Sequence, residues 1–256
     1  MGMFTAAFDG AGRETNQPIM VVAGFVSSAE NWDEFSMLWN RRLQQDGLTY
    51  FHYKEFARWD ADEVKVKRPM QRDLMKLISK YAYRKFGFII SVDECPQMLS
   101  DEWNIRAYAL AAMDCVVQVD QWATSSERIR RSSIEYVFED GDKGQGRLIT
   151  LMQNCGLPFP LFRPGKRPEQ TPSGNSIPPF VPLQAADWVA GEYFMEAQRL
   201  VGKASGKRKG PRWGFQEFET FTGNVRYATE AKDLSALEQT FEVLARTRYL
   251  KDVSKS

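Results

Sequence analysis

The feature that most constrains the fold is a pair of apolar runs near the start of the chain. Residues 3–8 and 18–27 are rich in apolar, β-branched and aromatic residues, and the turn-rich segment GAGRETNQ lies between them. Two such runs joined by a short polar turn predict an antiparallel hairpin of two central strands. The rest of the chain must therefore cover a sheet, and Asp9 lies where the first strand ends.

Beyond this hairpin, the hydrophobic period alternates between that of a helix and that of a strand. Buried runs at 88–94 and 133–138 predict two further strands. Apolar residues at helical spacing, with capping and stop signals, predict helices over about residues 28–47, 69–87, 104–122, 144–156, 183–203 and 234–250. Helices that alternate with strands predict an α/β fold in which helices flank a mixed sheet. We expect one domain over residues 1–256.

The segments between these elements lack a core pattern. Residues 49–56 predict a short strand or a strand that leads into a loop, and the charged residues 58–69 predict an exposed loop that ends where Pro69 opens a helix. The proline-rich residues 163–182 predict an irregular loop that could cover a site. The basic residues 203–212 predict a flexible connector.

Charge and cysteine content narrow the class of protein. The formal net charge is +1, from 34 basic and 33 acidic residues, so a protein that coats nucleic acid is excluded and any nucleic-acid contact must be local. The three cysteines are far apart and form no C-x-x-C pair, which predicts reduced, buried thiols. The first apolar run is too short for a signal peptide or a membrane span, so we expect a cytoplasmic protein without a membrane partner.

Acidic residues at strand ends are the candidate ligands for a divalent cation, because Mg²⁺ and Mn²⁺ prefer carboxylate oxygens. Asp9 ends the first strand, and Glu139 and Asp140 end a later one on opposite faces, so only one of these two should bind an ion directly. Asp187 lies within an apolar helix, where an unpaired carboxylate would be expensive to bury, and Gln184 shares its face. The simpler alternatives are a turn-forming Asp9, a solvated turn after Glu139 and a helix-capping Asp187.

His52 is the only histidine, and its ordinary pKa near neutrality would let it orient a water molecule or carry a proton. Lys54 and Glu55 follow it and could assist. A packed or surface role for the histidine is the alternative that the sequence leaves open.

These motifs together resemble the domain-of-unknown-function family 3800 (DUF3800), which is regarded as ribonuclease H-like. The resemblance covers about residues 3–195 and rests on Asp9 with its glycines, H-x-K-E-F at His52, F-E-D-G-D at 138–142 and L-Q-A-A-D at 183–187. It implies a ribonuclease H-like mixed sheet with an acidic site at Asp9, the pair Glu139 and Asp140, and Asp187, with Gln184 and His52 nearby. The family usually carries a second acid directly after its first Asp, whereas this chain has Gly10.

The leading hypothesis is a metal-dependent phosphodiesterase that hydrolyses nucleic acid with Mg²⁺ or Mn²⁺ held by these carboxylates. His52 would assist proton transfer, and Gln184, Lys54 and Gly10 would contact the substrate. Phosphates would be held by three basic segments, residues 128–131, 163–167 and 203–212. The alternative is a catalytically degenerate ribonuclease H-like module that binds nucleic acid or a partner protein, which Gly10 favours. A hydrolase of small molecules that uses the same acids is a third hypothesis.

Overall fold

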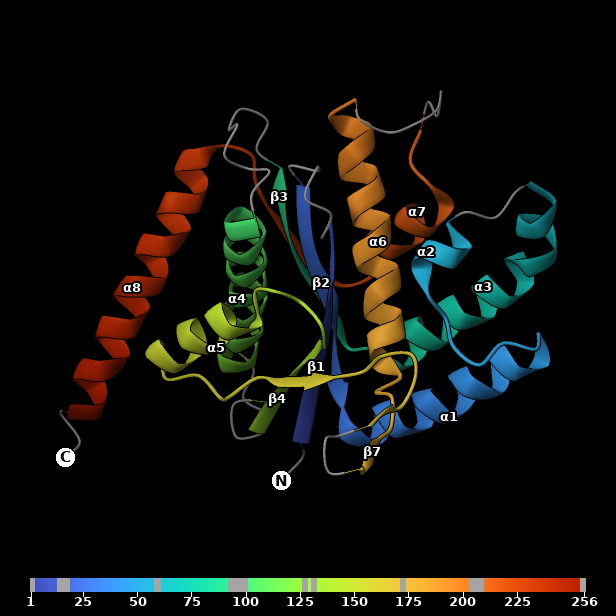
Figure 1. The fold of residues 1–256 in the computed structure, drawn as a ribbon, viewed down its shortest axis with the longest axis horizontal. Coiled ribbons are helices and arrows are strands. Elements are labelled where there is room, and N and C mark those ends of the chain that lie inside the picture. Colours follow the sequence, from blue (N-terminus) through green and yellow to red (C-terminus); the bar gives the residue numbers. More distant parts are fainter. Residues whose placement is uncertain are drawn as a thin grey trace.

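Six strands form one mixed sheet in the computed structural model, which describes residues 3–12, 19–57, 61–91, 101–125, 129, 133–170, 174–202 and 210–253. The strand order is β5-β4-β1-β2-β3-β8 (Figure 1). The strands are β1 (Met3–Ala11), β2 (Ile19–Ser28), β3 (Arg84–Ser91), β4 (Ser133–Glu139), β5 (Leu161–Arg163) and β8 (Gly223–Ala228). β2 is antiparallel to both of its neighbours, and the other pairs are parallel. The predicted central hairpin is therefore confirmed.

Helices cover both faces of this sheet (Figure 1). One face carries α4 (Asp101–Ser125), α5 (Gln145–Asn154) and α8 (Ala231–Val253). The other face carries α1 (Ala29–Gln45), α2 (Tyr53–Phe56), α3 (Ala61–Tyr81), α6 (Pro182–Leu200) and α7 (Trp213–Glu219). The prediction of an α/β domain with a mixed, helix-flanked sheet is confirmed. Among the described residues, no helix is long and apolar enough to span a membrane.

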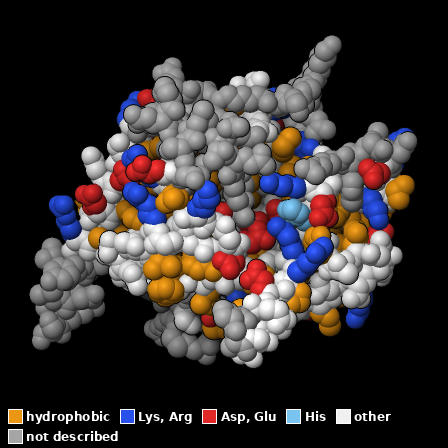
Figure 2. All heavy atoms as spheres, in the orientation of Figure 1, with side chains coloured by type: hydrophobic (Ala, Val, Ile, Leu, Met, Phe, Trp, Pro, Cys, Tyr) orange, Lys and Arg blue, Asp and Glu red, His pale blue; other side chains and the backbone are white. Residues whose placement is uncertain are grey.

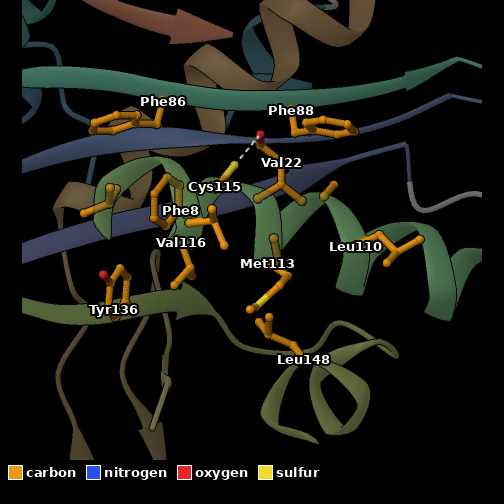
Figure 3. Close-up of a cluster of buried hydrophobic side chains, with 14 of the residues drawn as sticks. Phe8, Val22, Phe86, Phe88, Leu110, Met113, Cys115, Val116, Tyr136 and Leu148 are labelled. Carbon is orange, nitrogen blue, oxygen red and sulfur yellow. Dashed lines mark hydrogen bonds between the residues drawn. The ribbon is translucent and has the colours of Figure 1, made fainter. Parts of the chain in front are cut away.

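The α4 face of the sheet is almost entirely apolar. Residues 107–119 of α4 are all buried, and two polar side chains in this stretch bond across to the sheet or along the helix. Figure 3 shows the contact, in which sheet residues Phe8, Val22, Phe86 and Phe88 face α4 residues Leu110, Met113, Cys115 and Val116. The predicted helix over residues 104–122 therefore lies deep against the sheet. Cys115 and Cys155 are buried free thiols as predicted, whereas Cys95 lies outside the described residues.

The α6 face combines aromatic packing with buried polar groups. Trp39, Phe51 and Trp188 pack together beneath α6. Lys85 of β3 is only 3% exposed, and its Nζ donates to the Phe218 carbonyl oxygen at 2.6 Å and to the Tyr193 hydroxyl. Buried polar side chains therefore join strands to helices on this face, as Gln118 does on the α4 face.

Two predicted boundaries around α2 and α3 are wrong. Residues 53–56 form a helical turn instead of a strand, because Tyr53 and Phe56, three residues apart, both enter the core. α3 begins at Ala61, so Pro69 lies inside the helix instead of opening it. The residues before Pro69 show no apolar stripe because they contact the protein through side chains such as Arg68, which stacks on Trp213. Residues 58–60 of the predicted loop lie outside the described part of the chain.

Other elements were not predicted. α7 and β8 occupy residues 213–228, for which no element was expected. β8 lacks a clear strand pattern because it is an edge strand that buries little surface. The proline-rich segment is mostly irregular, but it also contains the end of β5 and the short hairpin of β6 (Glu169–Gln170) and β7 (Ser176–Ile177). Residues 92–94 of a predicted strand and 203–209 of the basic connector lie outside the described residues.

Candidate functional site

Asp9 and Glu139 follow the last paired residues of the parallel strands β1 and β4. β4 ends at Glu139, whereas β1 continues to Ala11 and Asp9 pairs with Ala23 of β2, so the predicted strand end at Asp9 and the alternative of a turn-forming Asp9 are both wrong. The register pairs Phe8 of β1 with Phe138 of β4, so the two acids follow at the same level. Ala7 and Val137, two residues earlier, pack against Leu183 of α6, and side chains two apart on a strand share a face. Asp9 is 2% exposed and Glu139 is 7% exposed. Two nearly buried carboxyl groups therefore face α6.

Asp187 supplies a third carboxylate from α6, one helical turn after Leu183. Its Oδ2 accepts a hydrogen bond of 2.8 Å from the backbone N–H of Tyr53. α6 begins at Pro182, so Asp187 is an interior helical residue and the alternative of a helix cap is wrong. Burial raises the pKa of Asp187 above its ordinary value, and the nearby Glu139 adds to this, against the opposing effects of Lys166, the Tyr53 N–H and His52. The pKa is raised because a carboxylate is held where it is poorly solvated.

Lys166 lies among these three acids. Its Nζ is 3.0 Å from Glu139 Oε1, and the side chain is 25% exposed. Burial acts to lower the pKa of Lys166, but the attraction of Asp187, Glu139 and Asp9 outweighs it and raises the pKa above the ordinary value. We call Asp9, Glu139, Asp187 and Lys166 the carboxylate–lysine cluster. Lys166 is the internal counter-ion of this cluster.

Sequence reasoning did not single out Lys166. Its only signal was its place in the basic segment 163–167, which was considered as a phosphate-binding region. Gly165 before it lets the loop approach closely, because a Cβ there would lie 3.1 Å from both Glu139 Oε1 and Leu183 Cβ. A glycine followed by a lysine in a proline-rich loop is a weak pattern, so only the folded arrangement reveals the cluster.

Gln184 holds the two segments that flank the cluster. Its Oε1 accepts hydrogen bonds from the Phe51 backbone N–H at 2.7 Å and from Trp39 Nε1 at 2.9 Å, and its Nε2 donates to the Gly165 carbonyl oxygen at 2.9 Å. Gln184 and Asp187 thus both bind the backbone of residues 51–53, which confirms that they share a face of α6. The structure shows Gln184 in a positioning role, and contact with a substrate remains a prediction.

The cleft beside the cluster has a volume of about 430 Å³. Its walls carry basic and acidic side chains together with Tyr50, and the charged or titratable ones are Lys166, Arg167, His52, Glu139, Asp140 and Glu169. His52 Nδ1 is 3.5 Å from Glu55 Oε1, while Arg167 stacks on Tyr50 at 5.1 Å and donates to its hydroxyl group at 3.1 Å. Figure 2 shows this mixture of acidic and basic side chains around the histidine. Lys54 is exposed and does not line the cleft.

Glu139 is the last residue of β4 and Asp140 is the first residue of the turn that follows, so the predicted strand alternation does not extend to Asp140, and both residues line the cleft. Asp140 is exposed, and its Oδ1 accepts from the Gly141 N–H at 2.8 Å and from Gln145 Nε2 at 2.9 Å. Asp140 therefore stabilises the turn that leads into α5, whereas Glu139 faces Lys166. The structure brings Glu139, and not Asp140, beside Asp9.

Gly10 points to the opposite side of the sheet from Asp9. A Cβ at this position would lie 3.2 Å from the Tyr108 ring of α4 and 3.4 Å from Asp142 Oδ2. An acid here, of the kind that the resemblance leads one to expect, would therefore be directed toward α4 and Asp142. It would not be directed toward Lys166.

The donor atoms of the cluster are of the type that hard divalent cations bind, but their present spacing suits an ammonium group. Among the described residues, no group of three or more His, Cys, Asp or Glu side chains is close enough together to hold a metal ion. The three carboxylates surround Lys166 instead. Metal binding at this cluster would require the Lys166 side chain to withdraw.

No model of a known protein family, no curated protein and no solved structure matches this chain. Similarity therefore assigns neither a family nor an activity. The features that bear on function are the carboxylate–lysine cluster and the cleft beside it.

Proposed function

We propose that the protein is a metal-dependent phosphodiesterase that hydrolyses nucleic acid, built on a ribonuclease H-like version of the mixed sheet and related to DUF3800. The observation that carries the proposal is the convergence of Asp9, Glu139 and Asp187, from three separate elements, on one cationic centre beside a cleft. Buried acids with a perturbed pKa at the carboxyl ends of strands are typical of active sites in α/β proteins.

In this proposal, Asp9, Glu139 and Asp187 would hold Mg²⁺ or Mn²⁺ after Lys166 has moved aside. The bound ion would supply a water molecule of lowered pKa and would neutralise charge on the phosphate. Lys166, once displaced, and Arg167 would bind phosphate oxygens, because both line the cleft. His52 lies at the same wall and would orient the attacking water or carry a proton.

The neighbouring acids Glu139 and Asp140 allow a matched test. Labelled single-stranded and double-stranded DNA and RNA would be incubated with the protein and Mn²⁺ or Mg²⁺. We expect hydrolysis of at least one substrate, and a loss of about 100-fold or more in Asp9→Asn, Glu139→Gln and Asp187→Asn. Asp140→Asn should lose much less activity than Glu139→Gln, because Asp140 lines the cleft but its Oδ1 is bound within the α5 turn and does not face Lys166. No hydrolysis by the wild type, or equal losses in Glu139→Gln and Asp140→Asn, would contradict the proposal.

The alternative proposal is a binding module without hydrolytic activity, and one observation favours it. Lys166 already compensates the three carboxylates, so the cluster can remain folded without any metal ion. In such a module Lys166 and Arg167 of the cleft would bind nucleic acid or an acidic partner protein. Binding of a labelled oligonucleotide that is unaffected by Mn²⁺ and by Asp187→Asn would favour this alternative.

A further inference from the structure

A second cavity, of about 380 Å³, lies between α2, the first half of α3, α6 and α7. Its apolar walls include Phe56, Trp188 and Trp213, and its polar groups are Arg68, Gln71, Arg212 and the acid Glu192. This volume lies within the range of about 300–1,000 Å³ that is usual for small-ligand sites. None of these residues belongs to the carboxylate–lysine cluster, so the cavity requires its own explanation.

Two guanidinium groups give this cavity a positive charge. Arg68 stacks on Trp213, with its Cζ 4.5 Å from the ring centroid, and forms no ion pair with any described residue. Burial lowers the pKa of Arg68, and the nearby Arg72 and Arg212 lower it further, against the opposing effect of Glu192. Arg212 Nε pairs with Glu192 Oε2 at 3.0 Å. Glu192 thus offsets one arginine, and the second guanidinium can bind an anion.

Gln71 adds an unsatisfied hydrogen-bond acceptor to the same wall. It lies three residues after Arg68 in α3, so the two side chains share a face of the helix. Gln71 is only 9% exposed, and its Oε1 is buried without a hydrogen-bond partner. A buried carbonyl oxygen of this kind is normally satisfied, so it points to a ligand that donates a hydrogen bond here.

We propose that this cavity binds a small organic phosphate. Its phosphate group would bind the Arg68 guanidinium, because Arg212 is already paired with Glu192, and a neighbouring hydroxyl or amine would donate to Gln71 Oε1. An apolar or aromatic part would pack on the walls formed by Phe56 and Trp213. A mononucleotide carries all three features. This site goes beyond the proposed hydrolysis of nucleic acid and does not depend on it, since none of its groups belongs to the cluster.

The test is calorimetric titration of the full chain with AMP, ribose 5-phosphate, inorganic phosphate and adenosine. We expect AMP or ribose 5-phosphate to bind at least about tenfold more tightly than adenosine, which lacks the anion, and than inorganic phosphate, which lacks the organic part. Absence of binding by both organic phosphates, or equal binding of adenosine, would overturn the proposal. Equal binding of inorganic phosphate would equally contradict it.

Variants separate this cavity from the rest of the surface. Arg68→Gln should weaken binding of the organic phosphate at least about tenfold, whereas Arg41→Gln, on the exposed side of α1, should leave it unchanged. Gln71→Leu should also weaken binding without lowering the melting temperature of the free protein, because it removes an unsatisfied oxygen. Asp187→Asn should bind as the wild type does. Unchanged binding in both Arg68→Gln and Gln71→Leu would place the ligand elsewhere and refute the site.

Discussion

Two lysine ammonium groups on the α6 side of the sheet are held in opposite ways. Lys85 is 3% exposed and is bound by the Phe218 carbonyl oxygen and the Tyr193 hydroxyl, with a half-exposed Glu219 at 3.4 Å. Burial lowers the pKa of Lys85 despite that carboxylate. Lys166 is more exposed and lies among three carboxylates, which raise its pKa. The same residue type is therefore buried for two different reasons.

This difference between the two lysines indicates that the bonds of Lys85 stabilise the fold, whereas those of Lys166 offset buried charge. Lys85 of β3 bonds mainly to neutral acceptors in α6 and α7, so these hydrogen bonds stabilise the packing of the two helices on β3. Lys166 offsets carboxylates that are unfavourable to bury without a counter-ion. A protein that keeps such a concentration of charge gives up some stability, which is common at sites retained for binding or catalysis.

The largest effect on stability should come from Lys85→Met. This change leaves the Phe218 carbonyl oxygen and the Tyr193 hydroxyl without their buried partner, so we expect a loss of about 3 kcal/mol in the free energy of unfolding. Urea unfolding monitored by circular dichroism measures it. Lys76→Met is the control, because Lys76 is 77% exposed and should contribute little. A loss no larger than that of the control would mean that the hydrogen bonds of Lys85 do not stabilise the fold.

Gly191→Ala should be the next most damaging change, and it acts on the Lys166 side. A Cβ at Gly191 would lie 2.1 Å from the Tyr53 ring, so α2 must shift and the Tyr53 N–H must move from Asp187. We expect a loss of about 1–3 kcal/mol in unfolding free energy. Gly146→Ala in α5 meets no atom within 4 Å and should be neutral or slightly stabilising. Equal stability of the two variants would contradict this tight contact.

Lys166→Gln should destabilise the protein by about 1–2 kcal/mol at neutral pH, because three carboxylates lose their counter-ion. The folded pKa of Lys166 is raised above 10.5, so its contribution is complete below that pH and is lost as the pH rises through the folded pKa. The difference from the wild type should therefore shrink in strongly alkaline solution. Lys85 has the opposite sign, because its lowered pKa makes its contribution rise with pH up to about 10.5. Unfolding curves between neutral and alkaline pH that show the same trend for both lysines would contradict the opposite pKa shifts of Lys85 and Lys166.

Asp187→Asn should have the smallest effect and the opposite direction. The folded pKa of Asp187 is raised, so its ionised form weakens the fold as the pH rises from 3.8 through the folded pKa. A neutral amide keeps an oxygen for the Tyr53 N–H and should raise the melting temperature at neutral pH by about 2–4 °C. Thermal unfolding measures the gain, which should vanish at strongly acidic pH. A lower melting temperature at neutral pH would show that the charge of Asp187 stabilises the fold.

The sequence predicted the elements whose periodicity is complete within the element itself. The hairpin of β1 and β2, the deep helix α4 and the start of α6 near Leu183 all carry such patterns. These predictions are confirmed because local pattern and tertiary packing agree. Strand alternation did not decide between Glu139 and Asp140, because β4 ends at Glu139 and both residues line the cleft.

The remaining features depend on contacts between segments that are far apart in the chain. Gln184 of α6 forms hydrogen bonds with the backbone of Phe51 and Gly165, and the bond to Gly165 places Lys166 beside the acids. No local sequence pattern around Lys166 predicts this position. α2 is too short to show a period, and β8 at the sheet edge buries few residues. The acids of the site were therefore predictable from their positions, whereas their counter-ion was not.

We propose that Asp9, Glu139 and Asp187 form one cation site, which the Lys166 ammonium group occupies in this structure. Calorimetric titration with Mn²⁺ tests it most directly, on the wild type, on Lys166→Gln and on Lys166→Gln combined with Asp187→Asn. We predict that Lys166→Gln binds Mn²⁺ at least about tenfold more tightly than the wild type and that adding Asp187→Asn abolishes this gain. Equal affinity in the wild type and Lys166→Gln, or a gain that survives Asp187→Asn, would contradict the account.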